Sequence, residues 1–483
     1  MTNASKHTIG RLQIEIQAGS KKKAVALQEE ISNISRNQLP EILETTFNQF
    51  DKKGSSYVID KLVIDMGKIG YDDFKLKFPA DFKKALNQKL KPLQMNTPDL
   101  VLDENTIVKE ETDFHIAKSY LLTGHLPWYS DSSQINLRQI SKKLIRKKSI
   151  EFVNLIRLHC TDRNFQNRLE NVIPESFYKE FFSLFTQRNI WKDDAVFKQY
   201  LLLYRQFPFA TATIKAFRIL LFKSIIEVLP TDFSSESLQL ETLVFSKLAD
   251  KLSINTTQLV KKSSHSLKKL QAKQGSNELT TQLSLLFHQL EGRFKHEDKK
   301  ADKQDEVQVI QPDKEEENNS YLIFNAGLIL VNPFLNELFK KLNLIENGEF
   351  INEQVQMKAV HLLQYAVTGK TGSPEHILLL NKILCGVQVN LAVPWFVKLN
   401  MKEKAETTRM ITATIKNWSA LKNTSAGAFR TAYMQRNGIL IKTKNGWKLQ
   451  VERTAYDVLL SRIPWQYEQV KLSWMKQKIE TVW

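Results

Sequence analysis

The chain has 483 residues, of which 42% are hydrophobic and 25% are charged, and this balance is typical of a folded protein. It contains only 16 Gly and 13 Pro, which excludes a collagen-like chain and a chain that is disordered throughout. The 69 basic residues exceed the 52 acidic ones and give a formal net charge of +17. A polyanionic partner (nucleic acid, anionic lipid or an acidic protein wall) or simple solubility could explain this excess.

The sequence predicts a soluble protein that is made in the cytoplasm. Two cysteines, Cys160 and Cys385, stand far apart in apolar surroundings, which indicates neither a disulfide framework nor a zinc site. The start, MTNASKHTIGRLQIEI, contains no apolar stretch typical of a signal peptide. The longest apolar run, at residues 321–331, is about half of the roughly 20 residues that cross a bilayer, so we expect no membrane insertion.

The first region, residues 1–92, has the pattern of a small β-α-β-α domain. Apolar and polar residues alternate over 12–16, as in a strand with one buried face. Ser20 is placed to cap the helix that follows, and Pro40 should kink that helix or split it in two. A second alternating segment at 57–67 and an amphipathic helix at 72–90 complete the unit.

Residues 111–292 are predicted to form a stack of short helices, because helical spacing recurs there and prolines interrupt it. Two basic stretches stand out, KKLIRKK at 142–148 and KKSSHSLKK at 261–269. Solvated helix faces are the commoner explanation for such stretches than binding sites. Residues 293–320 carry dense charge of both signs and few apolar residues, which is typical of a flexible linker.

Residues 321–483 are predicted to form a helical domain that a β-hairpin closes. Asn332 and Pro333 indicate the start of a helix, with Asn332 as its capping residue. The stretch ILIKTKNGWKLQV predicts a hairpin, since two alternating segments meet at Asn445 and Gly446. Further helices are expected at 353–367, 373–385, 402–418, 426–436 and 455–462. The predicted fold class is therefore mainly α, with small α+β end domains.

The end of the chain is rich in tryptophan. Val470, Leu472 and Trp474 alternate as a further strand, which we expect to pair with the hairpin. Trp447 and Trp474 should then pack in the closing core. Trp465 follows a proline at a turn, and it remains the better candidate for docking a partner protein.

No motif in the chain predicts catalysis, a cofactor or a metal. The string TGKTG at 368–372 lacks the first glycine of a phosphate-binding loop and follows a helical pattern instead of a strand. His361, His376 and Cys385 match no ligand spacing, so structural roles are the better explanation for them. We therefore expect a protein that is not an enzyme, and nucleic acid is an improbable partner because no long basic stretch alternates with aromatic residues.

Several segments resemble the tape measure proteins of contractile injection systems. At the N-terminal end the resemblance lies in IDKLVIDMG and in LLTGHLPWYS, which is similar to the family's Leu-x-x-Gly-x-Leu-Pro-Trp element and contains Trp128. At the C-terminal end it lies in four segments in the expected order: NAGLILVNPFLNELFKKLNL, KAVHLLQYAVTGKTGSPEHILLLNKILCG, NWSALKNTSAGAFRTAYMQRNGIL and WKLQVERTAYDVLLSRIPWQYEQVKLSWM.

The resemblance implies a non-enzymatic structural or assembly protein of a phage tail-like particle, in which family members set the length of the inner tube. Its implied partners are the inner tube, the baseplate hub or spike, and the cap proteins, with Trp465 and Trp128 as candidate docking residues. The chain would then be found in the cytoplasm or within an assembled particle. The alternative from the residues alone is a basic helical protein that acts as a cytosolic assembly chaperone or binds nucleic acid.

Overall fold

A computed structural model describes residues 7, 9, 12–50, 62–71, 73–91, 112–127, 130, 135–185, 213–229, 237–275, 278–297, 320–421 and 423–483. The chain divides into two compact units, Met1–Thr112 and Asp113–Trp483. The second unit contains both the predicted central helical region and the predicted C-terminal domain. The domain boundaries proposed from the sequence remain predictions.

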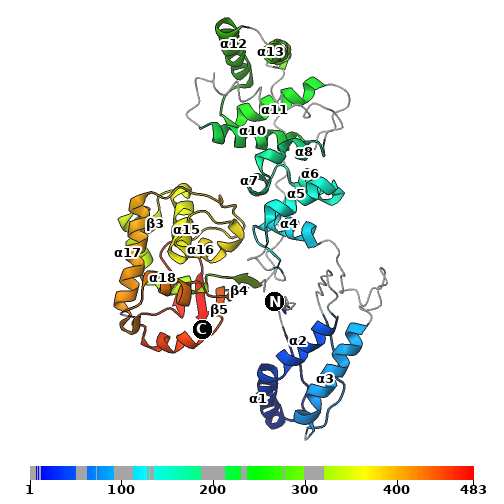
Figure 1. Ribbon diagram of the computed structural model, residues 1–483, viewed down its shortest axis with the longest axis vertical. Coiled ribbons are helices and arrows are strands. Elements are labelled where there is room, and N and C mark those ends of the chain that lie inside the picture. The colour runs from blue at the N-terminus through cyan, green and yellow to red at the C-terminus, as the bar shows by residue number, and fades with distance from the viewer. Residues whose placement is uncertain are drawn as a thin grey trace. The chain divides into compact units, whose positions relative to one another are not determined.

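Helices make up the regular structure of the first unit (Figure 1): α1 (Lys21–Asn37), α2 (Leu39–Phe50) and α3 (Phe74–Leu90). The backbone N–H of Lys23 donates to Ser20 Oγ at 3.3 Å, which confirms the predicted cap. The predicted split near Pro40 is also confirmed, because α1 ends at Asn37 and α2 begins at Leu39. A proline restricts the residue before it, which favours a helix boundary at this point.

The core of the first unit lies along one face of α3. Phe74, Phe78, Phe82, Leu86 and Leu90 are buried at four-residue spacing, which places them on the same side of the helix. Side chains from α1, α2 and the segments before and after them pack on this row, among them Ile14, Ile34, Leu39, Leu43, Leu62, Ile64, Met66 and Ile69.

The two strands predicted for the first unit do not occur in its described residues. Residues 12–18 and 62–70 carry no strand, and residues 57–61 of the second predicted strand lie outside the described part. Leu12 and Ile16 are 48% and 42% exposed, so the apolar side of the first segment is not covered by a further layer. A pair of strands without such cover is marginal, and Ile14 packs directly on the helical core instead.

The central part of the second unit is helical, as predicted. Its core is rich in aromatic residues, and Phe181, Phe182 and Phe222 are fully or almost fully buried there. The predicted linker is described only at its ends, where residues 293–297 belong to α13 and Ser320 begins β1. The elements are α4 (Thr112–Thr123), α5 (Leu137–Lys147), α6 (Ile150–His159), α7 (Arg163–Val172), η2 (Glu175–Phe177), α8 (Tyr178–Phe182), α10 (Ile214–Val228), α11 (Ser237–Lys251), α12 (Thr256–Gln274) and α13 (Glu278–Glu297).

The C-terminal part of the second unit packs helices around a small sheet. The helix predicted at Asn332 is present, but the Asn332 side chain does not cap it and donates to Ile329 O at 3.0 Å and Gln466 O at 3.2 Å. The helical elements are η4 (Ala326–Val331), α14 (Asn332–Lys341), α15 (Glu353–Thr368), η5 (Glu375–Ile377), α16 (Leu379–Leu384), α17 (Met401–Asn417), η6 (Ser419–Leu421), α18 (Ala426–Phe429), η7 (Arg430–Met434) and η8 (Ala455–Arg462). A short ribbon joins β2 (Ile345–Glu346) to β3 (Glu349–Phe350).

The main sheet has five strands in the order β1-β4-β5-β7-β6. The predicted hairpin is confirmed, but its turn is shifted by one residue, because Thr443 pairs with Gly446 and the central turn residues are Lys444 and Asn445. All neighbouring strands run antiparallel except β5 and β7, which are parallel. The strands are β1 (Ser320–Ile323), β4 (Gly438–Thr443), β5 (Gly446–Val451), β6 (Gln469–Val470) and β7 (Lys478–Val482). This sheet and the predominance of helices confirm the predicted fold class.

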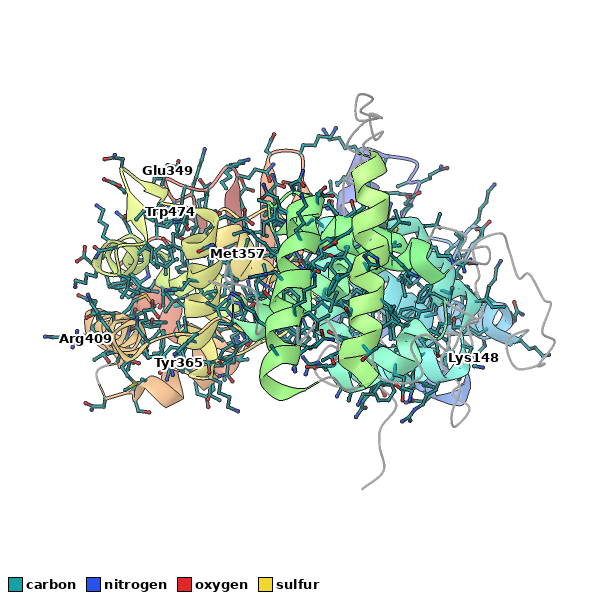
Figure 2. The ribbon with its side chains drawn as sticks, turned by 90° about the horizontal axis from the view of Figure 1, so that it is seen from above. Lys148, Glu349, Met357, Tyr365, Arg409 and Trp474 are labelled. Carbon is teal, nitrogen blue, oxygen red and sulfur yellow. The ribbon has the colours of Figure 1, made fainter. Side chains whose placement is uncertain are left out.

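The strand predicted at Val470, Leu472 and Trp474 is wrong in extent and in partner. β6 ends at Val470 and lies at the sheet edge, and β7 is the strand that pairs with the hairpin. The chain turns at Leu472, whose carbonyl accepts from the backbone N–H of Met475 at 3.0 Å. This turn lets the Trp474 indole N–H donate to Leu384 O at 2.8 Å. The packing prediction is confirmed, since Trp447 and Trp474 are each only 5% exposed in the core. Figure 2 labels Trp474.

Candidate functional site

The two predicted docking tryptophans have different outcomes. Trp128 lies outside the described residues. Trp465 is half-buried, and its indole N–H donates to Leu330 O at 2.9 Å. Its ring meets the Phe334 ring edge to face, with 5.1 Å between the centroids. Trp465 is therefore anchored in its own fold through its polar end, and a docking role for its remaining exposed surface stays a prediction.

The residues considered for a metal or thiol site are buried within the fold. The His361 ring Nε2–H donates to Pro394 O at 2.8 Å, and burial lowers the pKa of this histidine. Burial also raises the pKa of the Cys385 thiol well above its usual value, which disfavours the reactive thiolate. His376 packs edge to face against Tyr120. No group of three metal-binding side chains occurs among the described residues.

The TGKTG string ends a helix, as expected for a connecting loop. α15 runs to Thr368, and Gly369 follows it in the left-handed region with φ +69°. Glycine is the usual residue at this position after a helix.

The most unusual chemistry in the second unit is a group of three buried charges. Arg168 on α7 forms a two-pronged ion pair with Glu375 on η5, with Nε–Oε2 and Nη2–Oε1 distances of 3.2 Å. Lys382 on α16 donates from Nζ to Glu375 Oε1 at 2.6 Å. All three side chains have zero solvent exposure. We call Arg168, Glu375 and Lys382 the buried ion cluster.

Backbone carbonyls complete the hydrogen bonding of the two cations. Arg168 Nη1 donates to Leu122 O at 2.8 Å, and Arg168 Nη2 also donates to Asn390 O. Lys382 Nζ donates to Val389 O at 3.0 Å. One carboxylate thus serves two cations, and the neutral carbonyls supply the remaining acceptors. Such completion is what makes buried charge tolerable in a protein.

Burial shapes the electrostatics of this region. It lowers the pKa of Lys382, and the neighbouring Glu375 carboxylate opposes that shift. It also lowers the pKa of His125 well below the usual value, with added repulsion from Lys382 and Arg168. The pKa of the Tyr120 hydroxyl is raised well above its usual value by burial and by Glu375. Burial therefore disfavours the charged form of Lys382, of His125 and of Tyr120.

The segment 389–395 connects the central helices with the C-terminal helices. In addition to the carbonyls of Val389 and Asn390, the backbone N–H of Ala392 donates to Asn164 Oδ1 at 3.0 Å. The Trp395 indole N–H donates to the Tyr120 hydroxyl oxygen at 2.8 Å. A cavity of about 20 Å³ nearby, next to His125 and His376, is too small for a substrate.

Gly124 shows why the LLTGHLPWYS element has a glycine at this place. Its φ is +80°, and an added Cβ would lie 2.9 Å from Arg168 Nη2 and overlap the Glu375 carboxylate. The carbonyls of Leu121 and Leu122, in the same element, accept from Arg168. The backbone of Leu121–Gly124 therefore lies directly against the buried ion cluster, and a side chain at residue 124 would clash with it.

The sequence interpretation missed the buried ion cluster, although one signal was available. Glu375 and Lys382 are lone charges within the apolar stretch HILLLNKILCG and the residues just before it. A separation of seven residues is about two helical turns, so both face the same side. Nothing in the sequence indicated Arg168 as their partner, because it lies 207 positions before Glu375.

Comparisons with known proteins agree with the resemblance seen in the sequence. A family model described as contractile injection system tape measure protein matches residues 6–483. Searches of curated proteins and of solved structures gave no match. In the part of the chain that the structure describes, no helix is long and apolar enough to cross a membrane. Because the family model matches nearly the entire chain, the chain belongs to the contractile injection system tape measure protein family.

Proposed function

We propose that the chain is a non-enzymatic assembly protein that helps to set inner-tube length as a folded organiser, and not as a fully extended ruler. The observation that carries this proposal is the compact fold of Asp113–Trp483, within which buried charges tie α7 to η5 and α16. Its partners would be the inner tube, the baseplate hub or spike, and the cap proteins. It would act in the cytoplasm during assembly or remain in the particle.

Dimensions support a folded organiser. As one continuous helix, 483 residues would span roughly 720 Å at about 1.5 Å per residue. The longest described helix, α13, has 20 residues and hence a length of about 30 Å. To act as a fully extended ruler, the second unit would have to unfold and expose its buried core and the buried ion cluster. This unfolding costs free energy, whereas a folded organiser keeps both buried.

A change in chain length outside the described fold would test the proposal. A helical insert of about 40 residues, placed at one point within residues 305–310, adds about 60 Å to an extended chain. If the chain is a folded organiser, purified particles carrying this insert keep their length in electron micrographs, whereas deletion of the whole gene abolishes particles or broadens their length distribution. A matched control carries a flexible Gly-Ser insert of equal length.

Two results would contradict the proposal. Particles that lengthen in proportion to the helical insert would show a literal ruler. A deletion strain with normal particles in normal number would remove any assembly role. Mass spectrometry of the purified particles would show whether the chain remains in them or acts only during assembly.

A further inference from the structure

The solvent side of α5 concentrates positive charge that takes no part in the buried ion cluster. The apolar side of this helix is buried through Leu137, Leu144 and Ile145. No acidic residue occurs between positions 137 and 150. The exposed and half-exposed side, with the residue that ends the helix, carries six cations: Arg138, Lys142, Lys143, Arg146, Lys147 and Lys148. We call this set the α5 basic face, and Lys148 lies at its end (Figure 2).

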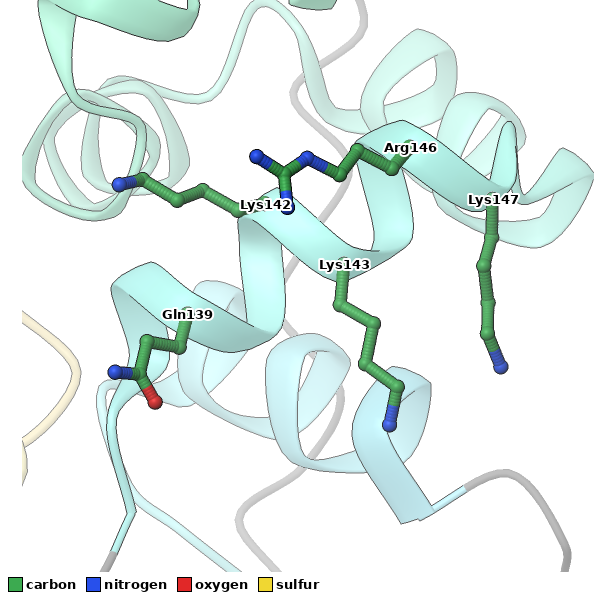
Figure 3. Close-up of a pocket in the computed structure, with 5 residues that line it drawn as sticks. All are labelled: Gln139, Lys142, Lys143, Arg146 and Lys147. Atoms are coloured by element: carbon green, nitrogen blue, oxygen red, sulfur yellow. The ribbon is translucent and has the colours of Figure 1, made fainter.

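The α5 basic face includes a surface hollow of about 330 Å³. Its lining includes Lys142 and Arg146, which extend from one side of α5, and Lys143 and Lys147, which extend from the other side of the helix (Figure 3). Gln139 completes the lining with an amide that can both donate and accept. The hollow is thus lined by ammonium and guanidinium groups, which form charge-assisted hydrogen bonds with carboxylates.

Ordinary structural roles explain part of this charge. Arg146 and Lys147 lie in the last turn of α5, where cations favour the helix dipole. Lys143 forms an ion pair with Asp113. Lys142 and Arg146 lie over the Phe177 ring, 4.7 Å and 5.2 Å from its centroid. These contacts hold the cations in place and so reduce the entropy that a ligand would have to remove.

The same contacts do not neutralise the face. Lys142 with Arg146 and Lys143 with Lys147 are like charges four residues apart, an arrangement that destabilises a helix. Within the described part of the chain, Asp113 supplies the one carboxylate that is ion-paired with the lining cations. An incoming carboxylate would relieve this repulsion.

We propose that the α5 basic face docks an acidic segment of another protein of the particle, with a carboxylate side chain seated in the hollow. That the partner is a protein rests on the proposed function. Stacking of single-stranded bases is disfavoured by the geometry, because Lys142 and Arg146 cover the Phe177 ring. Duplex DNA binds through its phosphates without stacking, so it is measured as the competing outcome in the test.

The test measures binding of the purified full-length chain to two labelled probes, a polyglutamate peptide and a DNA duplex, over a series of salt concentrations. The variant Lys143→Glu/Lys147→Glu reverses one side of the hollow. The control Lys261→Glu/Lys268→Glu makes the same change of net charge at exposed positions of α12. We expect the α5 variant to bind polyglutamate roughly tenfold more weakly than the unmodified chain, with the control nearly unchanged.

Each other outcome would overturn the proposal. Equal weakening in the α5 variant and in the α12 control would mean that binding follows net charge alone. Tighter binding of DNA than of polyglutamate at every salt concentration would assign the surface to nucleic acid. If Lys143→Glu/Lys147→Glu misfolds because of Asp113, then Lys147→Glu alone, which keeps that ion pair and the Phe177 contacts, must still weaken binding. Probe binding does not depend on tube length, so failure of the folded-organiser proposal would be seen separately in the particle lengths.

Discussion

Glu375 is the residue whose replacement should most directly test the account of the buried ion cluster. Glu375→Gln keeps the shape of the side chain and removes the negative charge that Arg168 and Lys382 share, both of which have zero exposure. Breaking a buried ion pair from one side leaves uncompensated charge and typically costs about 3–5 kcal/mol. The amide oxygen of Gln can still accept a hydrogen bond, so we expect the lower half of that range.

Urea unfolding followed by tryptophan fluorescence is the suitable assay. All eight tryptophans lie at position 128 or later, so their fluorescence reports only on the unit Asp113–Trp483. The matched control is Glu337→Gln, the same chemical change in an ion pair with Lys341 whose side chains are 66% and 57% exposed. Exposed pairs of this kind contribute about 0.3–0.5 kcal/mol.

The reasoning would be refuted if Glu375→Gln lowered the free energy of unfolding by less than about 1 kcal/mol, the scale of an exposed pair. We also expect the double variant Glu375→Gln/Lys382→Met to be more stable than Glu375→Gln alone. The second change removes one of the two cations that Glu375→Gln leaves uncompensated. A double variant that is less stable than the single one would contradict this charge accounting.

Three further predictions concern the second unit. Gly124→Ala should lower the free energy of unfolding by about 1–3 kcal/mol more than Gly275→Ala does, because both glycines have positive φ but only Gly124 touches the buried ion cluster. Equal losses of stability in urea unfolding would show that backbone strain alone matters. Trp474→Ala should cost about 3–5 kcal/mol, since the ring is buried and its N–H is bonded, and normal thermal stability would rule this out. Burial lowers the pKa of His125 and His361, so the unfolded chain binds more protons below about pH 6.5 and stability should fall there, by at most about 1.4 kcal/mol per pH unit for each histidine. Urea midpoints that stay constant between pH 7.5 and 5.5 would contradict the lowered pKa values. An unchanged dependence of stability on pH in His125→Gln would contradict the part given to His125.

Local signals predicted local structure well in this chain. Ser20 caps α1, the break before Pro40 separates two helices, and the hairpin forms with its turn only one residue from the predicted position. In each case the decisive interactions lie within a few residues, so that spacing and turn chemistry suffice.

Long-range pairing explains where prediction failed. Val470, Leu472 and Trp474 do alternate in the sequence, but the chain turns after Val470 and forms no longer strand. In this turn the Trp474 indole N–H donates to Leu384 O, a residue 90 positions earlier in the sequence. β7 was missed because its pairing with β5 is parallel and depends on a connection that sequence pattern does not encode. Strand propensity is decided by such neighbours more than by the segment itself.

The buried ion cluster shows why the site was less predictable than the fold. The free energy of each charge depends on partners from four segments. These are the carbonyls of Leu121 and Leu122, Arg168 on α7, Glu375 with Lys382 around α16, and the carbonyls of Val389 and Asn390. Read separately, an arginine on an amphipathic helix and a lysine on a short apolar helix both indicate exposed positions. Their common carboxylate and the surrounding carbonyls make burial of both cations tolerable, and the cluster links α7 with η5 and α16 inside the compact unit Asp113–Trp483.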